Sequence, residues 1–225
     1  MKFAFATLAA TLSVSAQLVP SADHPKIQIP QGLTLTQYAD NSKVVTPTTL
    51  CIDDNGRVFV SETFRWRKQV QDIRHGGENN RYLRERIEDD ISSMTRFDRL
   101  EFHKKWSGKE PDYLKFEEFD DDAETIKTME DTDGDGKADK FGMFRDDFNA
   151  PLAGPSSGLI EKDGTVYFAM IPGIYSLRDN DGDGIAEERK TLVDGFGVRV
   201  SFSGHDLNGF AFGPDGKLYW SIGDR

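Results

Sequence analysis

The chain has 225 residues, a length that suits one large domain or two small ones. Its 28 Lys and Arg residues against 39 Asp and Glu residues give a formal net charge of −11. This charge argues against a nucleic-acid-binding surface and favours metal cations as partners. Aromatic residues make up 11% of the chain, so we expect a folded hydrophobic core. The single cysteine, Cys51, excludes an internal disulfide, a cysteine-rich zinc module and a c-type haem within this chain.

Residues 1–16 have the pattern of an export signal. Lys2 precedes a run of apolar and small residues over 3–14, which is too short to span a bilayer comfortably. Small residues then fit a cleavage site before Gln17; a buried N-terminal helix is the alternative. We therefore expect an exported protein, periplasmic or extracellular, with no transmembrane segment. Residues 17–45 contain three prolines and are expected to be extended.

Two kinds of segment repeat along the chain. The acidic segment DTDGDGKAD at 131–139 returns as DNDGDGIAE at 179–187, 48 positions later. A Gly-containing turn followed by β-branched and aromatic residues occurs at 55–60, 163–168 and 215–220, which is typical of a tight turn and a strand. Short strands that repeat about every 50 residues indicate β-propeller blades of four strands each. The sequence therefore predicts an all-β fold of the propeller class.

We assign residues 46–225 to a partial β-propeller. The interval between the first two turn-and-strand copies is too long for one blade, and the excess at about 65–120 predicts a helical insertion after the first blade strand. Within it Leu83, Ile87, Ile91 and Met94 recur at helical spacing, and the charged face is expected to be solvated. Two or three blades cannot close a ring, so we expect the chain to be the N-terminal piece of a longer protein.

The acidic segments have the donor pattern of calcium-binding loops. Carboxylates stand at positions 1, 3, 5 and 9 with glycine at position 6, and hard oxygen donors select calcium over zinc or copper. The Glu that completes an EF-hand at position 12 is missing, so other oxygens must finish the shell. An acidic turn without metal is the alternative; we expect calcium in a structural role. The expected ligands are Asp131, Asp133, Asp135 and Asp139 in the first loop, and Asp179, Asp181, Asp183 and Glu187 in the second.

A candidate catalytic segment begins at His205. This histidine precedes a Gly-Pro-Asp-Gly-Lys-Leu-Tyr stretch at 213–219, which is followed by Gly223 and Asp224. The arrangement and the spacing from His205 to Asp224 resemble the soluble quinoprotein glucose dehydrogenase and sorbosone dehydrogenase family. Members of that family are six-bladed propellers that use pyrroloquinoline quinone (PQQ).

Nearly all of residues 28–225 resemble a second group, the N-terminal propeller of large proteins classed as membrane-bound dehydrogenases in planctomycetes and verrucomicrobia. Besides the insertion and both acidic loops, the shared motifs are GRVFVSE at 56–62, GFGVR at 195–199 and SGHDL at 203–207. Proteins of this group commonly continue into helical repeats and a C-terminal c-type haem domain. The resemblance therefore implies a six-bladed propeller in the full-length protein and a cytochrome domain as a partner.

The resemblance also implies roles for individual residues. His205 would be the general base that takes the proton of an alcohol while a hydride passes to the quinone, and Asp224 would orient this histidine. From its charge alone, Arg225 could meet a carboxylate of the cofactor. The resemblance thus implies a dehydrogenase that oxidises a sugar or another alcohol.

Two alternatives stay open, because propellers serve as binding modules as well as enzymes. One is a calcium-stabilised propeller that binds a carbohydrate, including a polysaccharide, or a partner domain without turnover. The other is a calcium-dependent lactonase with its metal on the propeller axis. Three further expectations concern packing. Trp66 is expected in the core or at the rim, His103 is expected to be exposed, and the small residues of 151–158 lie where cofactor contacts would be expected.

Overall fold

The computed structural model describes residues 18–22, 25–73, 82–109, 113–200, 205 and 207–223. The chain divides into two compact units, one up to residue 38 and one from residue 39 onwards. In the first unit β1 (Leu18–Pro20) pairs with β2 (Gln28–Pro30) in an antiparallel hairpin. The expected export signal, residues 1–16, lies outside the described residues.

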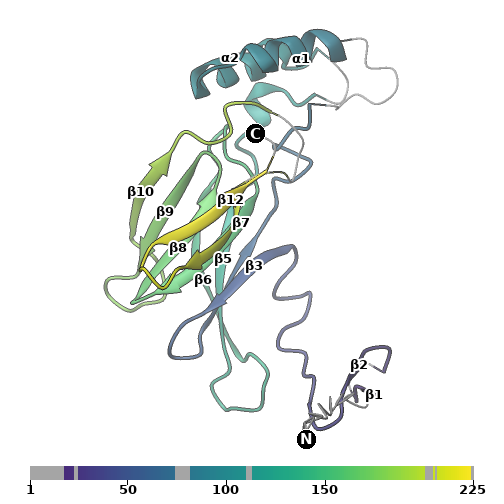
Figure 1. Ribbon diagram of the computed structural model, residues 1–225, viewed down its shortest axis with the longest axis vertical. Coiled ribbons are helices and arrows are strands. Elements are labelled where there is room, and N and C mark those ends of the chain that lie inside the picture. Colours follow the sequence, from purple (N-terminus) through teal and green to yellow (C-terminus); the bar gives the residue numbers. More distant parts are fainter. Residues whose placement is uncertain are drawn as a thin grey trace, which may run out of the picture. The chain divides into compact units, whose positions relative to one another are not determined.

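The second unit is built from antiparallel sheets whose strands pair in chain order (Figure 1). The first sheet contains β3 (Pro47–Ile52), β4 (Val58–Glu62), β5 (Glu124–Glu130) and β6 (Lys140–Phe148). The second contains β7 (Ser156–Lys162), β8 (Thr165–Met170), β9 (Gly173–Arg178) and β10 (Glu188–Asp194). A further hairpin pairs β11 (Leu207–Phe212) with β12 (Leu218–Ile222). The predominantly β architecture is confirmed, and the described sheets form no closed barrel.

The repeats in the sequence correspond to repeated places in these sheets. Each turn-and-strand copy forms the turn between the first and second strands of a sheet, together with the second strand itself. Gly56, Gly164 and Gly216 occupy these turns with φ between 74° and 84°, a region that glycine enters without a steric penalty. Each acidic segment joins the third and fourth strands of a four-stranded sheet. One sequence repeat is therefore one sheet.

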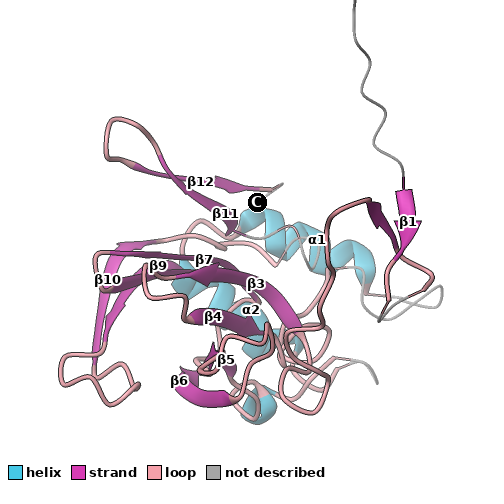
Figure 2. Ribbon diagram, turned by 90° about the horizontal axis from the view of Figure 1, so that it is seen from below, coloured by secondary structure: helices cyan, strands magenta, loops and turns pink. Residues whose placement is uncertain are grey.

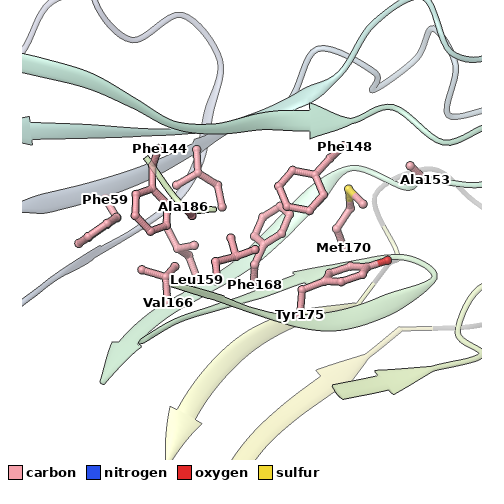
Figure 3. Packing of buried hydrophobic residues seen from close by; sticks show 12 residues of the cluster. Phe59, Phe144, Phe148, Ala153, Leu159, Val166, Phe168, Met170, Tyr175 and Ala186 are labelled. Atoms are coloured by element: carbon pink, nitrogen blue, oxygen red, sulfur yellow. The ribbon is translucent and has the colours of Figure 1, made fainter. Parts of the chain in front are cut away.

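The core lies between the two four-stranded sheets. Phe59 and Phe144 of the first sheet meet edge to face with ring centroids 5.0 Å apart. Phe148 of β6 packs on Phe168 of β8 at 4.7 Å, which joins the two sheets through aromatic contacts (Figure 3). Ala186 is fully buried in this cluster, and its N–H donates to the carbonyl of Phe144 at 2.9 Å. The end of the second acidic loop is thereby anchored to the first sheet.

The first strands of the sheets lie next to one another. β7 contacts both β3 and β11, so it lies between the first strands of the other two sheets (Figure 2). Gly158 of β7 approaches the ring of Phe210 of β11, since a Cβ there would stand 3.6 Å from that ring. The three chain segments that enter these strands are therefore brought to one side of the unit.

Two helices, α1 (Leu83–Ser92) and α2 (Arg96–Trp106), lie between β4 and β5. They follow the second strand of the sheet, not the first as expected, because Pro47–Ile52 also forms a strand, β3. Thr95 starts α2 with a capping box that it shares with Asp98. In the described part of the chain, no helix is both long enough and apolar enough to cross a bilayer.

The buried residues of α1 are not the expected ones. Ile87 and Ile91 are 37% and 57% exposed, and Met94 just after the helix is 75% exposed, whereas Arg86 and Asp90 are buried. Most other charged side chains of α1 are exposed as expected, but the expectation of a solvated charged face fails at these two residues. Nη2 of Arg86 donates to the carbonyl of Ile73 at 2.9 Å, and Asp90 accepts from a backbone N–H of the β10–β11 connection. The buried charged groups thus satisfy backbone groups of neighbouring loops.

Candidate functional site

A cavity of about 750 Å³ lies where the first strands of the sheets begin; we call it the strand-entrance cavity. Its walls come from the segments around β3 and after β4, from the entrance of β7, and from β11. The residues that line it are Thr46, Pro47, Thr48, Thr63, Phe64, Trp66, Lys68, Pro155, Ser156, Ser157 and Asn208. Three of these, Pro155 to Ser157, belong to the small-residue segment at 151–158 where cofactor contacts were expected.

Small hydroxyl groups connect the strands around this cavity. Oγ1 of Thr48 on β3 lies 2.9 Å from Oγ of Ser61 on β4 and 3.0 Å from Oγ of Ser156 on β7. Ser157 in turn donates a hydrogen bond to the carbonyl of Leu207 at the start of β11. The hydroxyls therefore link three sheets across the cavity, and hydroxyls that both donate and accept suit a ligand that does the same.

Aromatic rings and one cation complete the described walls. Trp66 is 45% exposed and lines the cavity, so it is available to a ligand and not packed in the core. The guanidinium of Arg67 lies over its ring, 4.6 Å from the centroid. Lys68 is the only charged side chain among the described lining residues, and its Nζ is 3.1 Å from Oδ2 of Asp122. The described walls are mainly neutral.

His205 lies just before β11, at the same strand entrance as Asn208, and its side chain is exposed. The end of β12 returns to this point: a Cβ on Gly223 would stand 2.7 Å from the carbonyl oxygen of His205. His205 itself is not among the residues that line the cavity. The residues expected to act with it, Asp224 and Arg225, lie outside the described residues. The structure thus places the expected base three positions before Asn208, a lining residue, without bringing it into the cavity lining.

The second acidic loop gathers four carboxylates. Asp179, Asp181, Asp183 and Glu187 each offer an oxygen, and these atoms all lie within 4.8 Å of one another. The two oxygens of Asp179 accept hydrogen bonds from loop amides, at 2.6 Å and 2.9 Å, which fold the loop around this carboxylate. The donors are hard oxygens, as calcium prefers.

In the first acidic loop fewer carboxylates converge. We call the carboxylates of a loop whose oxygens all lie within 4.8 Å of one another its close group. Asp131, Asp133 and Asp139 come together, and Asp135 is not part of the group. Backbone N–H groups, that of Gly136 above all, lower the pKa of Asp131 and keep it ionised. The expectation that four carboxylates converge in each loop therefore matches the geometry of the second loop, while in the first only three converge.

The spacing of three lining residues along the sequence is a signal for the cavity. Ser156 stands 108 positions after Thr48, and Asn208 stands 52 positions after Ser156. These are the same intervals that separate the three turn-and-strand copies. One repeat-equivalent position therefore supplies a polar side chain to the cavity from each of three sheets. The buried residues Glu124 and Arg65 behind the walls carried no such signal.

His103 was expected to be exposed, and this expectation is wrong, because its side chain is buried with 1% exposure. Its Nε2 accepts a hydrogen bond from Nε of Arg99 at 3.2 Å, and its Nδ1 lies 2.9 Å from the hydroxyl of Tyr113. It therefore belongs to the interior of the helical insertion and has no place at the cavity.

Comparisons with known proteins identify a family but no activity. No curated protein and no solved structure matches the chain. A family model described as a domain of unknown function, DUF7133, matches residues 19–225, which include both acidic loops and every residue of the strand-entrance cavity. The chain belongs to this family.

Proposed function

We propose that this chain is a propeller-type domain that binds a neutral sugar or another small polyol in the strand-entrance cavity. The observation that carries the proposal is the convergence of Thr48, Ser156 and Asn208 from three sheets on one cavity that also exposes Trp66. Sugar rings offer hydroxyls to polar side chains and an apolar face to an aromatic ring. Cavities with an aromatic wall and a few convergent polar groups are typical of small-molecule sites.

The charge of the cavity favours a neutral ligand. Lys68 is already paired with Asp122, and the other described lining side chains are uncharged. An anionic quinone such as PQQ needs cations for its carboxylates. Lys68 is the one cation among the described lining residues, and Arg67 stands beside them with its guanidinium over the ring of Trp66. The described residues therefore fit a sugar better than they fit this cofactor.

Calorimetric titration of the whole chain with neutral mono- and oligosaccharides tests the proposal. We expect at least one neutral sugar to bind, and Trp66→Ala to weaken that binding about tenfold or more, because the stacking face is lost. Trp220→Ala is the matched control, since Trp220 is 40% exposed but does not line the cavity. Equal effects of the two substitutions, or no binding of any neutral sugar by the folded protein, would contradict the proposal.

A dehydrogenase is the second candidate, and the position of His205 favours it. The imidazole lies at the strand entrance that also carries Asn208, and an imidazole there can accept the proton of a substrate hydroxyl. In this version the chain would oxidise the sugar or alcohol that it binds. Export and electron transfer to a c-type haem domain stay predictions that accompany this candidate.

Titration with PQQ, followed by dye-linked oxidation of a panel of sugars and alcohols, tests the second candidate. The protein should be loaded with calcium, and His205→Ala provides the comparison. Turnover that disappears in His205→Ala is the expected result for a dehydrogenase. Sugar binding without quinone binding or turnover would leave the domain as a binding module.

A structural role for calcium completes the proposal. In the second acidic loop Ala186 stands immediately before Glu187, one of the four converging carboxylates, and its N–H is bound to the first sheet. An ion there would offset the mutual repulsion of the carboxylates and hold the loop between β9 and β10. It would thereby stabilise the contact between the two four-stranded sheets.

A further inference from the structure

The side chain of Glu124, at the start of β5, is completely buried behind the strand-entrance cavity. Its Oε1 accepts three hydrogen bonds: from Oγ1 of Thr63 at 2.9 Å, from the N–H of Phe64 at 3.1 Å and from the N–H of Arg65 at 3.0 Å. Thr63 and Phe64 both line the cavity. One carboxylate oxygen therefore holds the wall that leads to Trp66.

The other oxygen of Glu124 holds the opposite wall. Oε2 accepts a hydrogen bond from the N–H of Ser156 at 2.7 Å. Ser156 lies at the entrance of β7 in the second sheet, and it lines the cavity. The two oxygens of a single buried carboxylate thus join cavity walls that belong to different sheets.

Arg65 makes a second link between the same walls. Its guanidinium is fully buried and donates to the carbonyls of Asp122 at 2.7 Å, Asn149 at 3.2 Å and Ala150 at 3.2 Å. The carbonyls of 149–150 belong to the connection that runs into the Pro155–Ser157 wall. Arg65 therefore fixes the approach to the wall that Glu124 holds directly.

Burying these two charged groups has an energetic cost. Desolvation lowers the pKa of Arg65 to about 10, and it raises the pKa of Glu124 against the opposing hydrogen bonds from Ser156 and Arg65. The guanidinium of Arg65 binds backbone carbonyls, and the carboxylate of Glu124 binds backbone and hydroxyl donors, so each charge is buried against neutral groups. Because desolvation of a charge is costly, these buried charges are weak evidence for stability alone. What the two residues provide here is geometry, since apolar side chains cannot bind backbone groups of both walls.

We propose that Glu124, supported by Arg65, is a positioning residue of the strand-entrance cavity. It fixes the wall that carries Trp66 relative to the Ser156 wall, and so sets the distance between the aromatic face and the hydroxyl groups that a sugar would meet. This inference rests on the proposed function for the identity of the ligand. The positions of the two walls can be measured without any ligand.

The test uses the whole chain labelled with 5-fluorotryptophan, whose three fluorine NMR signals are assigned by single Trp→Phe substitutions. Glu124→Gln removes one oxygen and introduces an N–H₂ that faces backbone or hydroxyl donors. Glu62→Gln is the matched control, because Glu62 is equally buried on the neighbouring strand β4. Its partners are Val45, Thr125 and Lys127, which do not line the cavity.

We expect Glu124→Gln to shift the Trp66 signal and to weaken sugar binding about tenfold, while Glu62→Gln leaves the Trp66 signal in place. If Glu124→Gln does not fold, Glu124→Asp replaces it. The shorter side chain keeps the charge but does not reach both walls, so the Trp66 signal should again shift. An unchanged Trp66 signal, or equal shifts in the Glu124 and Glu62 variants, would overturn the inference. Failure of the wild-type protein to bind sugars would instead overturn the proposed function, and the fluorine signals would still report on Glu124.

Discussion

Nη1 of Arg99 in α2 donates a hydrogen bond to the carbonyl oxygen of Gly197 at 2.6 Å. This contact joins the helical insertion, which leaves the first sheet, to the connection between β10 and β11. Asp90 of α1 binds the same connection, because its Oδ1 accepts from the N–H of Val200 at 2.5 Å. The two helices therefore hold the segment that leads towards His205 and the entrance of β11.

Gly197→Ala should destabilise the protein more than Gly216→Ala. Both glycines have positive φ, 66° and 74°, so alanine is strained by about 1–2 kcal/mol at either position. At Gly197 a Cβ would also clash with Cγ2 of Ile171 and stand 2.8 Å from Nη1 of Arg99, whereas at Gly216 it meets nothing within 4 Å. Urea unfolding measures both changes in the free energy of unfolding. Equal losses would contradict this close packing of Ile171 and Arg99 around Gly197.

Asp90→Ala and Ile91→Ala test whether Asp90, and not Ile91, is the buried residue of this part of α1. Asp90 is 6% exposed, and its loss leaves the N–H of Val200 without this acceptor, at a cost of roughly 1–3 kcal/mol. Ile91 is 57% exposed, so its truncation should change the free energy of unfolding by less than about 0.5 kcal/mol. A larger loss of unfolding free energy in Ile91→Ala than in Asp90→Ala would contradict this orientation of α1.

The two acidic loops should bind calcium with different affinities. Four carboxylates converge in the second loop and three in the first, so calorimetry should find the tighter site in the second loop. Asp183→Asn should weaken the second site about tenfold, whereas the repeat-equivalent Asp135→Asn should affect the first site less, because Asp135 lies outside its close group.

Calcium should also raise the thermal stability of the protein. Free calcium at about 100 times its Kd adds roughly 2.7 kcal/mol to the free energy of unfolding, so removal by a chelator should lower the Tm. Magnesium at the same concentration is the control, since it demands smaller octahedral sites. A Tm that does not respond to calcium would show that the loops are acidic turns without a structural ion.

Cys51 should react slowly with alkylating reagents in the folded protein. Burial, aided by the negative charge of Glu161, raises the pKa of its thiol from 9.0 to about 12. The thiolate is the reactive form, so at pH 8 iodoacetamide should modify the native protein roughly a thousandfold more slowly than the unfolded chain. Equal rates in the two states would contradict this burial.

The raised pKa of Cys51 also predicts how the free energy of unfolding changes at alkaline pH. The unfolded chain loses the thiol proton of Cys51 near pH 9, whereas the folded chain holds it to about pH 12. The contribution of this group to stability is therefore complete below pH 9 and is lost as the pH rises towards 12. Cys51→Ser should reduce this part of the alkaline loss in a urea-unfolding series.

Several features followed from the sequence because they depend on near neighbours. The glycine turns at residues 56, 164 and 216 and the strands after them are decided by φ preferences and by alternating side chains. The folding of the acidic loops is equally local, since the two oxygens of Asp179 bind amides three and five residues away. The repeat of these local units was enough to predict an all-β fold built from four-stranded sheets.

Other features were decided only by contacts between distant segments. Glu124 binds Ser156 in another sheet and Thr63 across the helical insertion, so its role depends on how two sheets meet. Asp90 is buried because the N–H of Val200, 110 positions away, needs an acceptor. Neither partner can be found from periodicity, which describes a residue only relative to its own helix or strand.

The sequence by itself determined the turns and the acidic loops of this protein, because contacts within about ten residues stabilise them, and it indicated the strands that follow the turns by their β-branched and aromatic residues. The tertiary structure alone decided that Thr48, Ser156 and Asn208 share one cavity and that Arg86 and Asp90 of α1 are buried. The physical reason is that buried backbone groups must find hydrogen-bond partners wherever the chain brings them. Those partners act together with the apolar cluster of the helical insertion, which includes Phe102, Trp106 and Val200.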